Sequence, residues 1–320
     1  MKWQLITIGE SLHASIPETG KIMKELNKLG SDAYCAPSKQ LDYIRALIES
    51  QTGDGANYIA VNVDSFGEDE LQVAVGMMRE YVTLIRKCGR GVPVCIDSSN
   101  DDVLTAGLKE WYNTAERLKP PLVNSVKIYT ADKILPLKKD FDFSFVGLLL
   151  SEKASAGPGI SSSVAEMHKL ARQIFDAAVG QYGFKSEQIF FDPMVFPLAI
   201  DMPMQPGVPG HTYRTFQTIK KIKTDRQMQG VHCVLGVSNC AADLPVRKIG
   251  VCRAYVAKAM EYGLDAAIVN VGHRYGQVEA AADLLELVDA YAKMDGSPER
   301  TDRAMQLVGK FCREIRTTAR

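Results

Sequence analysis

The sequence has 320 residues, of which 46% are hydrophobic and 24% charged, and its 38 basic side chains balance 38 acidic ones. A chain without net charge has no general field that attracts a nucleic-acid backbone or an acidic membrane surface, so we expect no nucleic-acid partner and no membrane. A small molecule or another protein is the expected partner. The length alone is compatible with one large domain or with two.

The N-terminus and the cysteines bear on the compartment in which the protein works. The stretch MKWQLITIGE has too short an apolar segment for a signal-peptide core and no cleavage site of small residues. No apolar run approaches the ~20 residues that span a bilayer. The seven cysteines are scattered and contain no C-x-x-C pair, which disfavours a disulfide framework. We therefore expect a cytoplasmic protein.

Eight short apolar or β-branched segments recur along the chain, separated by longer amphipathic stretches. Most of them are almost continuously hydrophobic, as parallel strands covered by helices are. We therefore predict strands at residues 5–9, 58–63, 93–97, 121–126, 143–150, 188–192, 232–237 and 267–272.

The stretches between these segments carry the boundary signals of helices. Ser163 and Glu166 form an S-x-x-E capping box ahead of apolar residues that share one helical face, namely Met167, Ala171, Ile174 and Ala178. Further helices are predicted at residues 38–52, 67–89, 101–117, 212–224, 245–263 and 276–293.

Alternating strands and helices can form an open doubly wound sheet or a closed (β/α)₈ barrel. A dinucleotide-binding sheet needs G-x-G-x-x-G after its first strand, but ESLHAS follows LITIG. No low-complexity linker divides the chain. We therefore predict one α/β domain over residues 1–320, with a (β/α)₈ TIM barrel at about 3–295 and an extra C-terminal helix at about 299–316.

Polar side chains stand where the predicted strands end. Along PVCID, Cys95 and Asp97 share one face of the strand, whereas Val94 and Ile96 face the covering helices. Because the active site of such a barrel lies at the carboxyl ends of its strands, Asp97 is expected at the barrel mouth. The same pattern recurs at other strand ends, with Glu10, Asn62, Asp64, Asn124, Asp192 and Asn239.

These residue types limit the ligand. Ionised carboxylates only accept hydrogen bonds and amides both donate and accept, so the set suits a flat heterocycle with an N–H edge. A phosphate site would need lysine, arginine or a glycine-rich nest, and none stands at these strand ends. Simpler roles stay open: Asp97 could cap the helix that starts near Asn100, and Asp192, before Pro193, could serve a turn.

Six short motifs follow one another in a fixed order. They are GESLHAS at 9–15, VNVD at 61–64, CIDSSN at 95–100, VNSV at 123–126, FDPMVFP at 191–197 and LGVSN at 235–239. Together they resemble the pterin-binding methyltransferases, which include methyltetrahydrofolate:corrinoid protein methyltransferases and the folate module of cobalamin-dependent methionine synthase. The resemblance implies an enzyme that moves a methyl group between N5 of tetrahydrofolate and the cobalt of a corrinoid, in a direction that the sequence does not indicate.

The resemblance also implies roles for the residues at the strand ends. Asp97, Asn124 and Asp192 match positions that bind the pterin, and Asn239 matches the catalytic amide near N5. The other three bind the pterin or support those that do: Glu10, Asn62 and Asp64. The substrates are tetrahydrofolate or 5-methyltetrahydrofolate and a corrinoid on a partner protein, since the chain has no D-x-H-x-x-G. The resemblance suggests a homodimer, and no bound metal is expected because the histidines lack metal spacing.

Two departures from the family pattern remove single contacts that the resemblance would imply, and two alternative functions stand beside methyl transfer. Ser11 stands where the family often has arginine, and Ala60 where it often has aspartate. Dihydropteroate synthase, a pterin condensing enzyme on the same barrel, needs Ser-Arg-Lys after strand seven and Arg-x-His late in the chain. Here Ser238-Asn239 and Gly272-His273-Arg274 occur instead. The other alternative is a folate-binding module without catalytic activity.

The segment 194–211, MVFPLAIDMPMQPGVPGH, is unusually long and apolar for a connection, with three methionines and four prolines. It could cover the substrate, receive a partner or simply pack on the surface.

Overall fold

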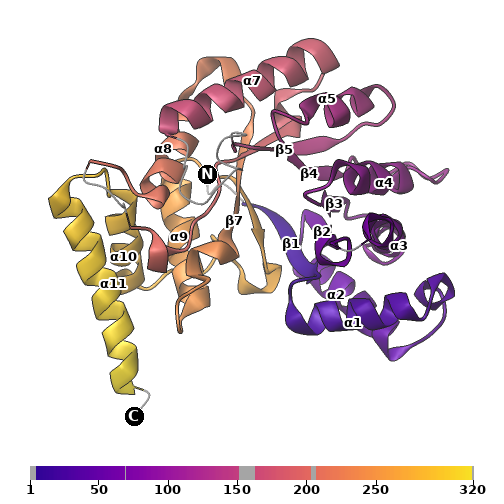
Figure 1. The fold of residues 1–320 in the computed structure, drawn as a ribbon, viewed down its shortest axis with the longest axis horizontal. Coiled ribbons are helices and arrows are strands. Elements are labelled where there is room, and N and C mark those ends of the chain that lie inside the picture. The colour runs from indigo at the N-terminus through magenta and orange to yellow at the C-terminus, as the bar shows by residue number, and fades with distance from the viewer. Residues whose placement is uncertain (1–4, 69, 151–162, 203–206, 319–320) are drawn as a thin grey trace.

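Eight parallel strands close into a barrel in the order of the chain (Figure 1). This computed structural model describes residues 5–68, 70–150, 163–202 and 207–318. The strands are β1 Ile6–His13, β2 Tyr58–Asn62, β3 Val94–Asp97, β4 Leu122–Val126, β5 Ser144–Leu148, β6 Ile189–Asp192, β7 His232–Gly236 and β8 Ala266–Val269. Each overlaps one predicted segment, so the prediction of a single-domain (β/α)₈ barrel is confirmed.

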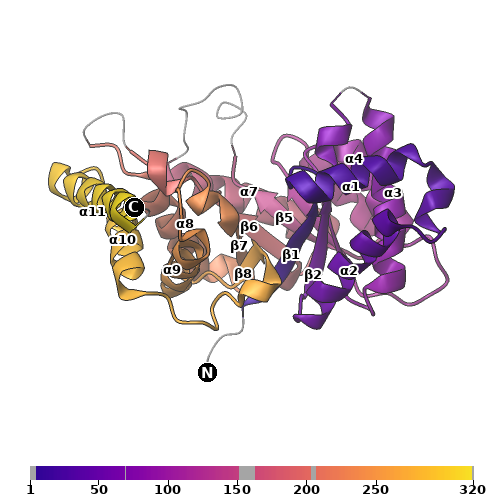
Figure 2. The ribbon, with the colours of Figure 1, turned by 90° about the horizontal axis from the view of Figure 1, so that it is seen from below.

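The helices surround the barrel (Figures 1 and 2). They are α1 Pro17–Lys28, α2 Lys39–Gly53, α3 Leu71–Cys88, α4 Asp101–Trp111, α5 Ala131–Ile134, α7 Val164–Tyr182, α8 His211–Thr224, α9 Lys248–Glu261, α10 Ala282–Ala292 and α11 Pro298–Thr318. In both views α1–α4 flank one side and α8–α11 the other. The expected C-terminal helix is α11, which packs outside α10. No helix within the described residues is long and apolar enough to cross a membrane.

The helices differ from the predictions in several places: α3 starts at Leu71 instead of 67, α10 starts at Ala282 instead of 276, and α5 was not predicted. Three other differences concern α1, α4 and α9. Helix α1 was not predicted, although Pro17 at its first turn and Lys28 at its last are the usual signals. Helix α4 ends at Trp111 instead of 117, because the chain turns at Asn113, whose N–H returns to the carbonyl of Glu110. Helix α9 starts after position 245, since Arg247 has a φ of 53°, which a right-handed helix excludes.

The capping box predicted for α7 is present. The hydroxyl of Ser163 accepts from the backbone N–H of Glu166 at 3.2 Å, and the Glu166 carboxylate accepts from the backbone N–H of Ser163 at 2.7 Å. The predicted apolar face is buried, and it comprises Met167, Ala171, Ile174 and Ala178. This end of α7 is therefore fixed by local sequence.

A layer of apolar side chains fills the barrel interior. Each strand contributes one of its members, which are Ile8, Ala60, Cys95, Leu122, Val146, Phe190, Val234 and Ala266. As predicted from the alternation along β3, Cys95 belongs to this interior layer, while Val94 and Ile96 pack in the core between strands and helices. The filled interior leaves room for a cavity only toward an end of the barrel.

A β-bulge interrupts the pairing of β1 with β2. Gly9 pairs with Ile59, but the next paired residue of β1 is Leu12, which lies beside Val61. Two residues of β1 thus stand opposite one residue of β2. Such a bulge shifts the alternation of side chains by one position and re-aims those that follow it.

The buried side chain of Gln51, on α2, holds this bulge. Its Oε1 accepts a hydrogen bond from the backbone N–H of Ser11 at 3.1 Å, and its Nε2 donates to the carbonyl of Leu47 at 3.1 Å. A Cβ at position 9 would lie 2.2 Å from Gln51 Oε1, so only glycine admits this contact. The backbone conformation at the end of β1 therefore depends on Gln51 of α2.

Replacing Gln51 with leucine should destabilise the fold. The substitution keeps a similar volume but leaves the Ser11 N–H without its acceptor, which costs about 1–3 kcal/mol. Urea denaturation of the Gln51→Leu protein measures this loss. The matched control is Gln72→Leu, an exposed position on α3, where a change within about 0.5 kcal/mol is expected. Equal losses in both variants would show that the bulge does not need Gln51.

Candidate functional site

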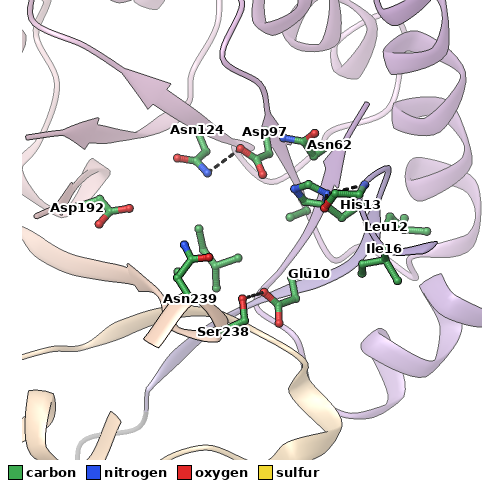
Figure 3. Close-up of a pocket in the computed structure, with 14 residues that line it drawn as sticks. Glu10, Leu12, His13, Ile16, Asn62, Asp97, Asn124, Asp192, Ser238 and Asn239 are labelled. Atoms are coloured by element: carbon green, nitrogen blue, oxygen red, sulfur yellow. Dashed lines mark hydrogen bonds between the residues drawn. The ribbon is translucent and has the colours of Figure 1, made fainter. Parts of the chain in front are cut away.

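A cavity of about 410 Å³ lies at the carboxyl ends of the strands. This volume is in the range of small-molecule sites. Six of the seven predicted residues line it, and Figure 3 shows them converging from opposite sides of the barrel: Glu10, Asn62, Asp97, Asn124, Asp192 and Asn239. The sequence therefore located the polar wall of this cavity. Three polar lining residues, His13, Ser15 and Ser238, were not among the predicted set.

Strand register explains why four of the lining residues are neighbours. His13 pairs with Asn62, Asn62 with Asp97, and Asp97 with Asn124 across β1 to β4. Neighbouring strands lie about 4.8 Å apart, so these residues form one row along the rim of the barrel. A ligand edge that lies along this row meets several of them at once.

Asp97 is the centre of a hydrogen-bonded group. Its Oδ1 accepts from Nδ2 of Asn124 at 2.8 Å, and it also accepts from the side chain of Asn62. The capping role considered for Asp97 is filled by Asn100, whose side chain accepts from the backbone N–H of Asp102 at 2.9 Å. Asp97 is therefore free to face the cavity.

Both aspartates of the cavity hold protons more tightly than usual. Burial raises the pKa of Asp97 to about 7, and the charges of Asp64 and Asp192 act in the same direction against the hydrogen bonds from Asn62 and Asn124. Burial also raises the pKa of Asp192 to about 7, opposed by its hydrogen bond from the Met194 backbone. A ligand that donates N–H groups stabilises the ionised forms of both.

Asp192 serves the turn and the cavity together. Its Oδ1 accepts from the backbone N–H of Met194 at 2.7 Å, which fixes the turn after β6. The turn role considered from the sequence is thus present, yet the carboxylate still lines the cavity. The hydrogen bond from the Met194 backbone therefore fixes both the turn and the orientation of the Asp192 carboxylate.

Asp64 does not line the cavity. Its carboxylate accepts from the hydroxyl of Ser98 and from the backbone N–H of Ser99, the two residues that follow Asp97. Of the two roles that the sequence left open, this geometry favours support, because Asp64 holds the turn that positions Asp97. The reason lies in the 3₁₀ turn at Asp64–Phe66, which directs the side chain toward the β3–α4 loop.

Glu10 and Asn239 form the opposite wall. The Glu10 carboxylate accepts from the hydroxyl of Ser238 at 3.3 Å. Burial raises the pKa of Glu10, and hydrogen bonds from Ser238 and the Asn270 backbone oppose the shift. Asn239 lies in the 3₁₀ turn Val237–Ala241, and its exposed side chain has no hydrogen-bond partner among the described residues. Its amide is therefore available to a ligand.

Sequence reasoning missed His13 because it ended the first strand at Gly9. In the structure β1 continues to His13, beyond the bulge, and the ring lines the cavity beside Asn62 (Figure 3). The residues LHAS were a signal that the strand continues past Gly9. However, Ile8 faces the barrel interior, so simple alternation would have directed residue 13 outward, away from the cavity.

The charge of the cavity is one-sided. Its described lining contains three carboxylates and no lysine or arginine. Across the described residues, no group of three or more histidine, cysteine or acidic side chains could hold a metal ion. The site thus offers acceptors and neutral amides to a ligand.

The described part of the loop 194–211 packs away from the cavity, and residues 203–206 lie outside the described residues. Asp201 is fully buried and accepts from the first two N–H groups of α8 at 2.6 and 2.8 Å. The N–H of Gly210 donates to the carbonyl of Met294 at 2.9 Å, which ties the loop to the end of α10. These contacts favour the interpretation as a packed surface loop.

Comparison with known protein families supports the chemistry of this cavity. A family described as pterin binding enzyme matches residues 23–270, which is most of the chain. The chain belongs to this family. Its members include dihydropteroate synthases and methyltetrahydrofolate methyltransferases, so a pterin or folate is the class of ligand that the family indicates. The match contains Asn62, Asp97, Asn124, Asp192 and Asn239, and it starts after β1, beyond both Glu10 and His13.

Two solved structures with a similar fold are dihydropteroate synthases. One, from Coxiella burnetii in complex with pteroic acid, has 11% identity and a TM-score of 0.53, with 86% of this chain and 91% of that chain covered. Another, from Yersinia pestis with a pterine-sulfa conjugate, has 12% identity and a TM-score of 0.52, with 89% and 92% covered. At such identities the likeness shows the shared fold alone.

Asp97→Asn should stabilise the ligand-free protein at neutral and alkaline pH. Between pH ~4, the ordinary range of an aspartate, and about 7, the folded protein keeps a proton on Asp97 that the unfolded chain has released. Stability therefore falls as pH rises through this window, and the loss is complete above it. Asparagine removes the loss, so the melting temperature at pH 8 should rise by roughly 2–4 °C for each kcal/mol gained.

Thermal denaturation at pH 5 and pH 8 tests this. The gain should be larger at pH 8, whereas Asp140→Asn, an exposed aspartate, controls for the loss of a surface carboxylate. A gain that is the same at both pH values would contradict the raised pKa of Asp97.

Proposed function

We propose that the protein moves a methyl group between N5 of tetrahydrofolate and the cobalt of a corrinoid carried by a separate protein. The observation that carries the proposal is the composition of the cavity wall: acceptors and amides, with no lysine or arginine in its described lining. Such a wall suits a pterin edge rich in N–H groups. Methyl transfer also requires no cation for an anionic leaving group.

The ring edge would lie against Asp97, Asn124 and Asp192. Nδ2 of Asn124 is already donated to Asp97, so its Oδ1 is the end that can accept from the ligand. The two aspartates accept from the 2-amino and ring N–H groups when ionised. Binding then replaces the unfavourable burial of two carboxylates with charge-assisted hydrogen bonds.

Asn239 would act at N5. In one direction the methyl group leaves methyl-cobalt without its bonding electrons and cobalt retains the pair as Co(I), while the lone pair of N5 forms the new N–C bond and N5 releases its proton to water. The reverse step returns the methyl to Co(I) from protonated N5. The neutral amide can accept from N5–H or donate to bare N5, so it can stabilise both states by positioning.

The corrinoid must arrive on a partner. A cavity of about 410 Å³ suits a pterin, whereas a corrin macrocycle with its lower ligand has to approach from the open mouth of the barrel. The homodimer and the cytoplasmic location that were expected from the sequence stay predictions, and sedimentation equilibrium of the purified chain tests the first.

A second candidate is a condensing activity of the dihydropteroate synthase type, because dihydropteroate synthases belong to the same pterin-binding family. That reaction displaces pyrophosphate, whose charge is normally stabilised by lysine, arginine or a metal ion. The described lining offers none of these side chains. Parallel assays separate the two: tetrahydrofolate with a methylated corrinoid protein, and a pterin pyrophosphate with p-aminobenzoate. Appearance of the Co(I) spectrum in the first supports the proposal, and product in the second alone overturns it.

Asn239→Ala should lower the rate of methyl transfer by about 100-fold, which is typical for the loss of one hydrogen-bonding group positioned at the reacting atom. The dissociation constant of tetrahydrofolate should change less than threefold, on the order of 0.6 kcal/mol, because the ring edge is held elsewhere. Stopped-flow measurement of Co(I) and calorimetric titration give the two values. Asn113→Ala, an exposed asparagine outside the cavity lining, is the control and should retain most of the rate. A wild-type protein that binds folate without turnover would identify a non-catalytic module.

Folate affinity should increase with pH from 6 to 8. Below about pH 7 Asp97 and Asp192 carry protons, which the N–H groups of the ligand must displace. Binding therefore releases protons at low pH and fewer at high pH. Calorimetry in buffers of different ionisation enthalpy counts them, and Asp192→Asn should reduce the count. An affinity that is independent of pH would exclude these carboxylates from the contact.

A further inference from the structure

His13 is a polar wall residue whose role neither the family match nor the sequence motifs explain. It ends β1, next to Asn62 in the strand register, and the family match starts ten residues later, at residue 23. The bulge that aims it into the cavity is held by Gln51. The loop that follows is also fixed. The N–H of Ala14 donates to the carbonyl of Asn62 at 2.9 Å, and the carbonyl of Ala14 packs so closely on Gly20 that a Cβ there would lie 2.1 Å from it.

The hydrogen bonds of the ring determine which nitrogen carries the proton. Nδ1 of His13 lies 3.1 Å from the backbone N–H of Ser15 and 2.8 Å from its hydroxyl. A backbone N–H can only donate, so Nδ1 is the acceptor and the neutral ring carries its hydrogen on Nε2. Burial lowers the pKa of His13, while the charge of Asp64 opposes the shift. The ring is thus a neutral donor.

Few donors in the cavity are left for a ligand. Asn62 and Asn124 each donate a side-chain N–H to Asp97, the hydroxyl of Ser238 donates to Glu10, and that of Ser15 donates to Nδ1 of His13. Nε2 of His13 has no hydrogen-bond partner among the described residues. It and the amide of Asn239 are the side-chain donors of the cavity whose nitrogen has no hydrogen-bond partner among the described residues, so an acceptor on the ligand meets them without competition from the protein.

His13 lies too far along the rim to serve the N–H edge of the ring. Two strand spacings separate the backbone of His13 from that of Asp97 and three from that of Asn124, or about 10 and 14 Å along the rim. Figure 3 shows His13 across the cavity from Asp192, on the side of Ile16. With the N–H edge at β3, β4 and β6 and N5 near β7, the carbon beside N5 faces β8 and β1. That carbon carries the arm of a folate.

We propose that His13 is a specificity-determining residue, whose Nε2–H donates to an oxygen of the arm beyond the bicyclic ring and so selects folates over unsubstituted pterins. The inference rests on the proposed function only in taking a reduced folate as the ligand. The exposed side chain of Ile16, which also lines the cavity, offers an apolar surface to the aryl part of that arm.

Calorimetric titration of the full-length protein with tetrahydrofolate and with 6-methyltetrahydropterin, which lacks the arm, tests the proposal. His13→Ala should weaken tetrahydrofolate binding about tenfold and leave 6-methyltetrahydropterin binding within twofold. His13→Gln places an amide N–H near the position of Nε2 and should restore tetrahydrofolate binding. His13→Asn places its amide near Nδ1 instead and should behave like His13→Ala.

The outcomes separate this inference from the proposed function. Equal weakening of both ligands by His13→Ala, or equal affinity of the wild type for both, overturns the role of His13 while the pterin site stands. A wild type that binds neither ligand refutes the proposed function and this inference together. The ¹⁵N shifts of the His13 ring give an independent test, because a charged ring or a proton on Nδ1 at pH 7.5 would contradict the neutral donor.

Discussion

The register of β1–β4 is the constraint on which the site depends. A slip of one residue in any of these strands would turn its terminal polar side chain toward the helices, since side chains alternate with a period of two. The interior layer, with one apolar residue from each strand, opposes such a slip. In β1 the bulge adds a second requirement, because His13 reaches the cavity only while Gln51 holds the N–H of Ser11. Core packing and the site are therefore coupled.

The cavity places polar groups where they oppose folding. Asp97 and Asp192 are forced toward their protonated forms by burial, and Asp64, which holds the turn after β3, adds its charge to Asp97. The amide of Asn239 and the Nε2–H of His13 also oppose folding, because neither has a hydrogen-bond partner among the described residues. A ligand that supplies the missing partners gains the hydrogen bonds without having to reorganise the wall.

The sequence predicted the barrel and most of this wall because both follow from short-range patterns. Hydrophobic runs located every strand. Because the carboxyl ends of parallel strands meet at one end of a barrel, the polar residues at the ends of six strands were then expected at one site. His13 escaped because the bulge depends on Gln51, forty residues away in the chain, and no local pattern reports that contact. The supporting position of Asp64 depends on Ser98 and Ser99 in the same way. Long-range hydrogen bonds to the backbone are thus what the sequence alone did not provide.

One-sided charge links the proposed reaction to the choice of donors. When the N–H groups of the ligand hold Asp97 and Asp192 ionised, the carboxylates of a lining in which no lysine or arginine is described create a negative potential, which favours a proton on a nearby base such as N5. That proton makes N5 a better leaving group when the methyl passes to cobalt, and it departs when the methyl returns. A lysine beside N5 would oppose protonation. Asn239 and the neutral ring of His13 can donate hydrogen bonds without adding positive charge, so they do not weaken the negative potential of the carboxylates.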